Sequence, residues 1–296
     1  NTGERARGAR YLGRVKQRKR EGRSALLKGR YLAIAAVIVV LLGGGLWLGI
    51  TTRGSGYPHT PPRAAPPTAP AQPGPASSIS LDGWKLTIPE EGKKGNAAII
   101  QPAAATPPWL TANPDGSLTF WAPAVGATTK NSAHPRTELN SLNNFDAGSG
   151  PHTLTAALSV AQVPSDTKDI IIGQIHGADS IISVPYVMLH YQNGNLRVVV
   201  KTTQDGNDAK TYPLISGVPL GARFNFTISD VGNGGMVFSA TYGGQTQRVT
   251  APIPTTFHGE PVRFQVGDYQ QAKDSDDPND GGRVTYYAIN EVTTAP

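Results

Sequence analysis

The sequence of 296 residues contains no cysteine. This absence excludes disulfide bonds, thiolate metal sites and thiol nucleophiles, and it is compatible with any cellular compartment. The sequence also lacks a Gly-rich phosphate-binding loop, a convincing nucleophile elbow and a cluster of side chains suited to catalytic zinc. We therefore expect neither a metal nor any other cofactor.

Charge is distributed unevenly, so the overall net charge of +6 describes no single part of the chain. Residues 1–30 hold eleven Lys and Arg side chains against two acids, Glu4 and Glu21. From residue 79 onward, 19 acidic side chains outnumber 14 basic ones. This part is not a general binder of polyanions, so an acidic ligand would have to meet a local basic groove.

The stretch 31–50 has 20 residues and no charged side chain. As a helix rising about 1.5 Å per residue, it would span the roughly 30 Å hydrocarbon core of a bilayer. The Lys/Arg run precedes it, whereas only Arg53 and Arg63 follow closely, so the positive-inside rule places the tail 1–30 in the cytoplasm. We predict a single-pass protein of the cell membrane whose C-terminal bulk lies outside.

A cleaved secretory signal is the alternative, and cleavage would release the C-terminal part. Against it, the basic region is long, the apolar run exceeds a usual signal core, and no small-x-small site directly follows Ile50. Nucleic-acid binding is a second reading of the basic run, but orientation and anionic lipid headgroups explain it more simply. We expect no nucleic-acid partner.

Residues 51–78 are rich in Pro, Ala, Gly and Thr and cannot bury a core, which is typical of an extended, semi-rigid linker. From 79 to 296, alternation of apolar and polar residues predicts strands, and no segment there has the pattern of a long amphipathic helix. The clearest strand segments are 153–160, 196–201, 224–228, 236–242, 262–266 and 284–292.

Two dipeptides in this region predict hairpin turns. Asn193-Gly194 and Gly243-Gly244 each separate two strand segments and supply residues that tolerate positive φ. Many strands joined by such turns over 218 residues favour an all-β fold, an antiparallel β-sandwich or jelly roll. We expect a monomer with one sheet face available as a groove.

Three segments, 136–140, 173–176 and 263–271, place polar side chains at the two-residue spacing of a strand. Apolar residues between them, such as Leu139 and Ile175, would face the core. The polar side chains expected to line one groove are Arg136, Glu138, Asn140, Gln174, His176, Gln265, Tyr269 and Gln271.

Together with Trp84–Pro89 (WKLTIP), these segments resemble four motifs of the alginate lyases with a β-jelly-roll fold, polysaccharide lyase family 7. The family motifs read W-K-L-T-[IL]-P, R-[ST]-E-L-[RN], Q-[IV]-H and Y-F-K-A-G-x-Y-N-Q. They occur here in the family's order, and the resemblance covers nearly all of 79–296. It implies a lyase that cleaves an acidic, uronate-containing polysaccharide, with alginate as the leading substrate.

Such a lyase removes the C5 proton beside the C6 carboxylate and expels the O4 glycosidic oxygen. Donors must offset the carboxylate charge because the developing dianion is unfavourable, and Arg136 and Gln174 are suited to this task. The resemblance gives His176 and Tyr269 the roles of base and acid. In guluronate the proton and the leaving oxygen lie on opposite faces, so His176 would abstract and Tyr269 would protonate O4. In mannuronate they share a face, and Tyr269 could do both, with His176 lowering the pKa of Tyr269 or orienting it.

The resemblance also links Ile175, within the Q-I-H segment, to a preference for guluronate. Arg197 and Lys201 share one face of the segment 196–201 and are further candidates for binding substrate carboxylates, although a solvated basic face explains them equally well. Glu138 could contact sugar or, as a cross-strand partner, hold Arg136 in place.

The sequence departs from the family pattern at three positions. Gln265 stands where Lys is usual, Asp268 stands where an apolar residue is usual, and Gln270 replaces Asn. Losing a cation and gaining an anion near Tyr269 would alter the local field, so a glucuronan-type lyase is one alternative.

The residues also allow two other functions and one metal site. A non-catalytic module that binds acidic glycans is an alternative, although binding alone does not need an acid and base pair. A glycoside hydrolase would need two suitably spaced carboxylates. The Asp-rich segment 274–281 lacks the ligand spacing of an EF-hand and is expected to be a solvated loop, with a structural calcium ion as the alternative.

Overall fold

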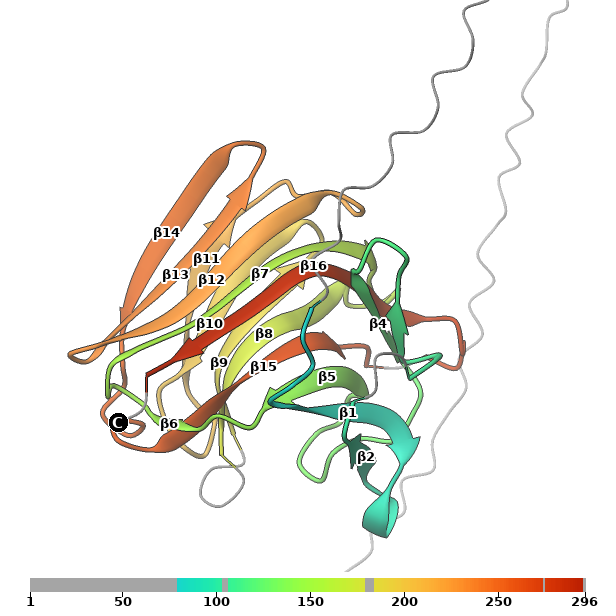
Figure 1. The fold of residues 1–296 in the computed structure, drawn as a ribbon, viewed down its shortest axis with the longest axis horizontal. Coiled ribbons are helices and arrows are strands. Elements are labelled where there is room, and N and C mark those ends of the chain that lie inside the picture. Colours follow the sequence, from blue (N-terminus) through green and yellow to red (C-terminus); the bar gives the residue numbers. More distant parts are fainter. Residues whose placement is uncertain (1–78, 103–105, 179–183, 274, 295–296) are drawn as a thin grey trace, which may run out of the picture. The chain divides into compact units, whose positions relative to one another are not determined.

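The computed structural model describes residues 79–102, 106–178, 184–273 and 275–294 (Figure 1). The predicted cytoplasmic tail, membrane span and linker at 1–30, 31–50 and 51–78 lie outside these residues. Within the described ranges, no helix is long and apolar enough to cross a membrane. The helical element in this part of the chain is a single 3-10 turn, Lys93–Gly95 (η1).

The described chain is otherwise built from strands, as the alternating pattern predicted. All six strand segments expected from the sequence are confirmed, each within a longer or equal strand. The strands are β1 (Trp84–Glu91), β2 (Ala97–Ile100), β3 (Leu110–Ala112), β4 (Leu118–Pro123), β5 (Arg136–Ser141), β6 (Phe145–Asp146), β7 (Pro151–Gln162), β8 (Asp169–Gly177), β9 (Pro185–Gln192), β10 (Asn195–Lys201), β11 (Ala209–Ile215), β12 (Arg223–Gly232), β13 (Gly235–Tyr242), β14 (Gln245–Pro252), β15 (Pro261–Gln270) and β16 (Gly281–Thr293).

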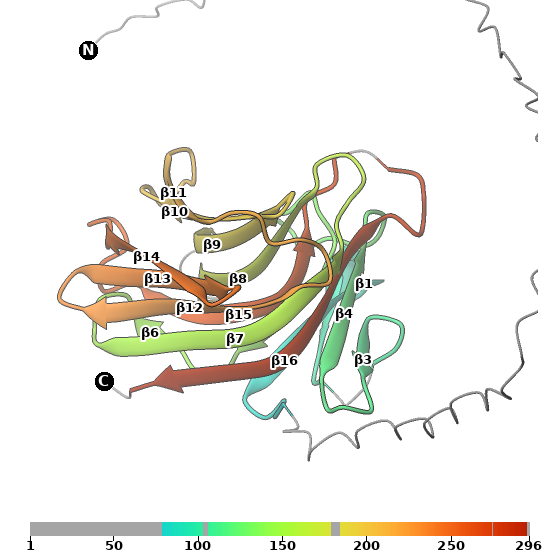
Figure 2. The same ribbon diagram turned by 90° about the horizontal axis from the view of Figure 1, so that it is seen from above.

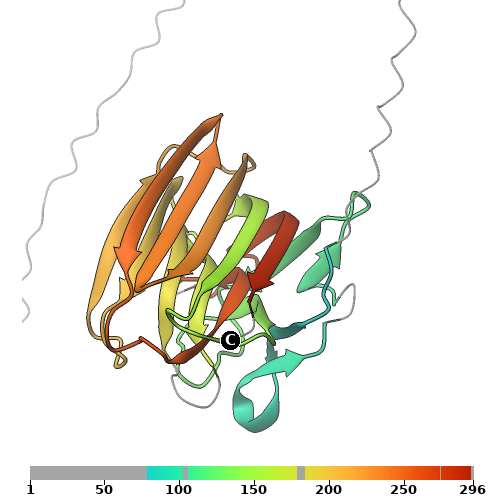
Figure 3. The same cartoon turned by 60° about the vertical axis from the view of Figure 1, so that its left-hand side comes forward.

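These strands form two antiparallel sheets. The larger sheet has the order β11-β10-β9-β8-β15-β5-β1-β2, with β6 also pairing with β15, and the smaller has the order β14-β13-β12-β7-β16-β4-β3. Figure 2 shows β8 to β10 in one layer and β7, β12 and β16 in the other. Figure 3 shows the β13–β14 hairpin at one edge and β1 with β2 at the opposite end. The predicted all-β antiparallel sandwich is confirmed.

Both predicted hairpin turns are confirmed. Asn193 and Gly194 connect β9 to β10 with φ of 48° and 80°, and Gly243 and Gly244 connect β13 to β14 with φ of 57° and 76°. Positive φ at both central residues matches the twist of the flanking strands, so each turn fixes the register of its hairpin.

The core lies between the sheets and forms from the inward residues of each strand. In β7, buried Leu154, Ala156 and Leu158 alternate with partly exposed neighbours, as expected for a strand with one covered face. On the inner face of the smaller sheet, the rings of Phe120 on β4 and Tyr286 on β16 pack edge to face with centroids 5.2 Å apart, and the Tyr286 hydroxyl donates across the sandwich to the carbonyl oxygens of Ile172 and Gly267. This packing supports the larger sheet from below and leaves its other face open for a site.

The order of the larger sheet decides which distant segments meet. Strand β15 pairs with β8 on one side and with β5 on the other, so Gln265 is the register partner of both Gln174 and Asn140. The three motifs identified in the sequence therefore lie on three adjacent strands of one sheet.

Candidate active site

A cavity of about 310 Å³ opens on the outer face of the larger sheet, above β5, β8 and β15. Of the eight side chains expected to line a groove, six do so. The lining residues are Thr87, Ile99, Thr129, Lys130, Asn131, Ser132, Arg136, Asn140, Gln174, His176, Gly177, Pro185, Arg263, Gln265 and Tyr269. This set contains no Asp or Glu, although acidic side chains outnumber basic ones from residue 79 onward.

Arg136 is held in place by Glu138. The Nη1 of Arg136 donates to Glu138 Oε2 at 3.1 Å, and Glu138 is completely buried beneath the cavity. Burial raises the pKa of Glu138, and the charge of Arg136 and a hydrogen bond from Gln174 oppose that rise. A buried carboxylate needs such partners, so Glu138 fixes the positions of the two groups above it.

Arg136 also stacks on Tyr269. The two residues are register partners on β5 and β15, and the guanidinium carbon lies 3.5 Å from the centroid of the phenol ring. A cation over an aromatic face is attracted to it, so the ring and the guanidinium orient each other. The Nε of Arg136 is buried and has no hydrogen-bond partner within the described part of the chain. A buried donor without a partner is costly, which is a feature of sites that receive an anion.

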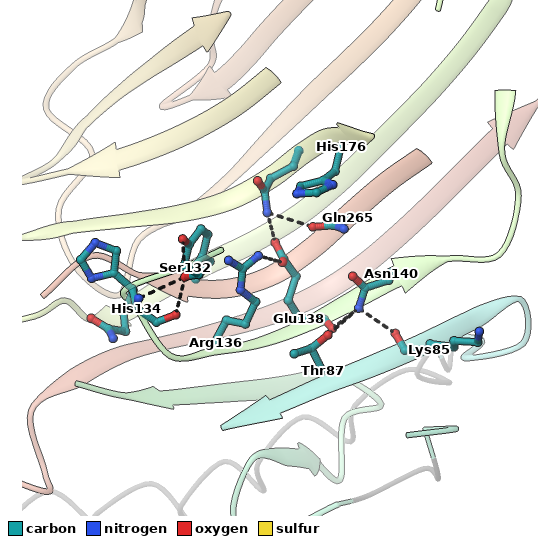
Figure 4. Close-up of polar contacts among 12 residues, drawn as sticks. Lys85, Thr87, Ser132, His134, Arg136, Glu138, Asn140, His176 and Gln265 are labelled. Atoms are coloured by element: carbon teal, nitrogen blue, oxygen red, sulfur yellow. Dashed lines mark hydrogen bonds and ion pairs between the residues drawn. The ribbon is translucent and has the colours of Figure 1, made fainter. Parts of the chain in front are cut away.

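The hydroxyl of Tyr269 lies 2.9 Å from Ser132 Oγ. Ser132 Oγ donates its own hydrogen to the carbonyl oxygen of His134 at 3.0 Å and accepts the His134 N–H at 3.1 Å. Either oxygen of the Tyr269–Ser132 pair can donate, and when the Ser132 hydrogen goes to the His134 carbonyl, Ser132 Oγ accepts from the Tyr269 hydroxyl. Figure 4 shows Ser132 and His134 on one side of Arg136 and Glu138, and Asn140 and Lys85 on the other.

Gln174 connects the carboxylate beneath the cavity to a row of amides. Its Nε2 donates to Glu138 Oε1 and, at 3.2 Å, to Gln265 Oε1. Both amide hydrogens are thus engaged, whereas the sequence predicted that they face a substrate carboxylate. Gln174 Oε1 is buried without a partner among the described residues. Next in the row, Asn140 donates to Thr87 Oγ1 at 2.9 Å.

His176 is half-buried on β8 and lines the cavity with Gln174. Its Nδ1 lies 2.9 Å from the carbonyl oxygen of Gly177, which can only accept, so Nδ1 carries a hydrogen. The neutral ring then has its lone pair on Nε2. This tautomer suits a base that takes a proton at Nε2.

Asp268 does not face the groove, contrary to the expectation that it adds an anion beside Tyr269. Its side chain is fully buried between the sheets against Gly282, where any side chain at residue 282 would collide with it. Burial raises the pKa of Asp268 well above its ordinary value, so the protonated form is favoured.

Four residues predicted to bind substrate do not line the cavity, and their contacts explain why. Glu138 is buried beneath it. Arg197 Nη2 forms an ion pair with Asp169 at 2.8 Å, and Lys201 Nζ donates to the carbonyl oxygen of Gly206 at 2.9 Å. The remaining one, Gln271, follows the end of β15 and donates to backbone oxygens of Tyr269 and Gln270.

The structure adds polar residues to the cavity that the sequence had not indicated, among them Arg263, Ser132 and Lys130. Arg263 lines the cavity two residues before Gln265, on the same strand face. The strand periodicity could have identified it. Ser132 and Lys130 come from the loop between β4 and β5, and no pattern in the sequence indicates that this loop covers Tyr269.

No group of three or more His, Asp or Glu side chains arranged to hold a metal ion occurs in the part of the chain that the structure describes. In the Asp-rich loop, the Asp280 carboxylate accepts one hydrogen bond from the backbone N–H of Ser165 at 2.8 Å and another from the Ser165 hydroxyl at 2.6 Å. This carboxylate joins two loops of the domain.

The family model for alginate lyases matches residues 79–292. The chain belongs to the alginate lyase family. The match spans the whole sandwich, including the three strands that carry the cavity, so the resemblance stated from four motifs is confirmed. Comparison with curated protein sequences gave no match.

Solved structures of alginate lyases share the fold. A Pseudomonas aeruginosa alginate lyase is 27% identical with a TM-score of 0.63, covering 73% of this chain and 100% of that one. The alginate lyase A1-II′, a member of polysaccharide lyase family 7, is 27% identical with a TM-score of 0.61, covering 74% and 97%. One from a Corynebacterium species is 25% identical with a TM-score of 0.59, covering 74% and 97%. The family and these neighbours make this chain a polysaccharide lyase.

Proposed function

We propose that the chain cleaves a 1,4-linked polyuronate, with alginate as the first candidate, by β-elimination in this cavity. One observation carries the proposal. Arg136, held by Glu138 and stacked on Tyr269, shares a cavity with His176, and among the described residues no carboxylate lines that cavity. The alginate lyases of known structure support the choice of substrate.

In this proposal the substrate carboxylate lies beside Arg136. The guanidinium of Arg136 lines the cavity and supplies donors, and the carboxylate competes with Gln265 for the second amide hydrogen of Gln174. Charge-assisted hydrogen bonds of this kind are stronger than neutral ones, and the need for them grows as the dianion develops. Arg136 and Gln174 thereby make the C5 proton easier to remove.

Proton transfer then uses His176 and Tyr269. On guluronate, His176 Nε2 takes the C5 proton while Tyr269 gives its hydroxyl proton to O4 as the glycosidic bond breaks and the C4=C5 double bond forms. A hydrogen bond from the Tyr269 hydroxyl to Ser132 Oγ, with the Ser132 hydrogen on the His134 carbonyl, supports the role of an acid. The arrangement therefore favours guluronate, for which the acid and the base are separate groups.

Two alternatives remain as proposals with different outcomes. A glucuronan-type lyase would use the same groups on another uronate, and Gln265, in place of the usual Lys, is the observation in its favour. A non-catalytic binding module would hold the polyanion without turnover. It would explain the cations of the cavity but leaves the Tyr269 hydroxyl and the oriented His176 without a role.

The test uses the chain of 296 residues, kept in a mild detergent because of the apolar stretch 31–50. It is incubated with polyguluronate, polymannuronate and glucuronan while the ultraviolet absorbance of the unsaturated product is followed. If the absorbance rises fastest on polyguluronate, the full proposal is supported. If it rises on glucuronan alone, the mechanism is kept and glucuronan replaces alginate as the substrate. Binding without product on all three would favour the module.

We also propose that the lyase domain is displayed outside the cell on a single membrane anchor formed by 31–50. The uncharged stretch after the Lys/Arg run supports this, and the linker 51–78 would hold the domain away from the bilayer. Expressed in bacterial cells, the chain should stay in the membrane pellet after carbonate extraction. Release of the domain into the medium would support cleavage of the anchor instead.

A further inference from the structure

A second cavity of about 290 Å³ adjoins the first on the outer face of the larger sheet. The two cavities share Ile99, Asn140 and Arg263, so they are parts of one groove. We propose that the second cavity is a subsite for a neighbouring uronate residue of the chain being cleaved, with Lys85 and Arg263 binding its carboxylate. This inference rests on the proposed lyase activity and extends it to a residue of the polymer that is not itself cleaved.

Lys85 lies in the second cavity and not in the first. On β1, buried Trp84 and Leu86 alternate with exposed Lys85, so the lysine side chain must lie on the groove face. Lys85 is the register partner of Asn140, and Figure 4 shows it beyond Asn140 as seen from Glu138. Among the residues that the structure describes, no carboxylate lies within ion-pair distance of its Nζ. Within this part of the chain, its charge is therefore not offset by an anion.

Arg263 joins this subsite to the catalytic groups. It is the register partner of His176 and lines both cavities. Lys85 lies on β1, which is two strands away from β15 in the sheet. Neighbouring strands are about 4.8 Å apart, so the two strands are separated by roughly 10 Å. At that distance, Lys85 reaches a neighbouring sugar and not the one whose C5 proton is removed.

The walls of the second cavity fit a sugar ring. Ile99 is 58% exposed and Leu142 is 48% exposed, both unusually high for large apolar side chains, and both line it. Apolar walls with a few placed polar groups are the usual composition of ligand sites, and these two side chains can cover the C–H face of a sugar. Asn140 and Asn144 supply amides for its hydroxyl groups.

The charges select an acidic sugar over a neutral one. Lys85 and Arg263 are the charged residues among the described side chains lining the second cavity, and both are cations. The family motif has a Lys at the position of Gln265, so the centre of this groove lacks that cation. Lys85 and Arg263 lie on either side of Asn140, which is the register partner of Gln265. We infer that the groove contacts uronate carboxylates here through the second cavity.

The test compares Lys85→Gln and Lys85→Glu with Lys93→Gln, a matched control on the exposed turn η1 that lines neither cavity. The exposed Lys85 side chain is outside the core, so both variants should fold as the wild type does. Full chains are given uronate oligomers of three to six residues, and kcat/KM is measured against length. An exposed ion pair contributes about 0.2–1 kcal/mol, which corresponds to a factor of up to about five.

We expect kcat/KM on the longer oligomers to fall about threefold in Lys85→Gln and more in Lys85→Glu, with a smaller loss on trimers and no change in Lys93→Gln. If the wild type cleaves uronates and the Lys85 variants match Lys93→Gln at every length, the subsite is wrong and the lyase activity stands.

If the wild type releases no unsaturated product, the proposed activity fails, and the subsite is judged by binding alone. The dissociation constants of the uronate hexamer for the same three variants are then measured by calorimetry. Weaker binding to Lys85→Glu than to Lys93→Gln supports the subsite, and equal binding overturns it.

Discussion

The hydroxyl of Tyr269 lies 2.9 Å from Ser132 Oγ, 137 residues earlier in the chain. When Ser132 gives its own hydrogen to the His134 carbonyl, Ser132 Oγ accepts from the Tyr269 hydroxyl and holds that hydroxyl in one direction. A loop residue therefore orients the group that we propose as the catalytic acid.

Replacing Ser132 by Ala should lower kcat about two- to tenfold, because a hydrogen bond of this kind contributes about 0.5–1.5 kcal/mol. KM should change little, since no charge is removed from the groove. The measurement is steady-state kinetics on polyguluronate. Ser132→Thr keeps the hydroxyl and should recover most of the activity, and failure of that rescue would indicate a role in loop packing.

Replacing Tyr269 by Phe should abolish most turnover while leaving substrate binding in place. The ring remains, so the guanidinium of Arg136 keeps its stacking partner, but O4 loses its proton donor. We expect kcat to fall by a factor of about 100 or more, the usual size of a general-acid contribution. Calorimetry with a uronate oligomer should show binding within a few-fold of the wild type. Full activity of this variant would contradict the mechanism.

Replacing His176 by Asn should slow the cleavage of polyguluronate more than that of polymannuronate. The Asn amide can still donate toward Gly177, as Nδ1 does, but it cannot take a proton. On polyguluronate kcat should fall about 100-fold. On polymannuronate the loss should be smaller, because Tyr269 can serve as both base and acid there. Equal losses on both polymers would show that His176 does not act as the guluronate base.

The buried carboxyl of Asp268 should make the free energy of unfolding depend on pH, and the substitution Asp268→Asn should remove that dependence. Burial raises its pKa well above the ordinary value, so the folded chain keeps a proton that the unfolded chain releases. The free energy of unfolding should therefore fall as the pH rises from near 4 toward the raised pKa, by about 1.4 kcal/mol for each pH unit in that window.

The check on Asp268 is chemical unfolding between pH 4 and pH 8, followed by tryptophan fluorescence. Relative to the wild type, Asp268→Asn should become more stable as the pH rises. Asp276→Asn, at an exposed carboxylate, is the matched control and should show no such trend. Parallel curves for wild type and Asp268→Asn would mean that the carboxyl is ionised in the fold.

Much of the site could be predicted from the sequence because strands alternate strictly. The spacing of Arg136 and Asn140, and of Gln174 and His176, put each pair on one face, and the structure confirms both faces. The same rule failed in the part of β8 that precedes Gln174. A register shift in β8 puts Ile171 beside Tyr269 on the groove face and Ile172 in the core, whereas alternation would have exchanged them. An extra residue in a strand leaves no mark in a pattern of apolar residues.

The sequence by itself determined the strands, the two hairpin turns and the residue types of the groove, because these depend on local periodicity and on φ preferences. Only the tertiary structure decided that β15 lies between β8 and β5, that Glu138 is buried under Arg136, and that Arg197 pairs with Asp169. Those outcomes depend on which distant strands become neighbours and on which charges burial forces to pair, and neither is encoded in the spacing of residues along one segment.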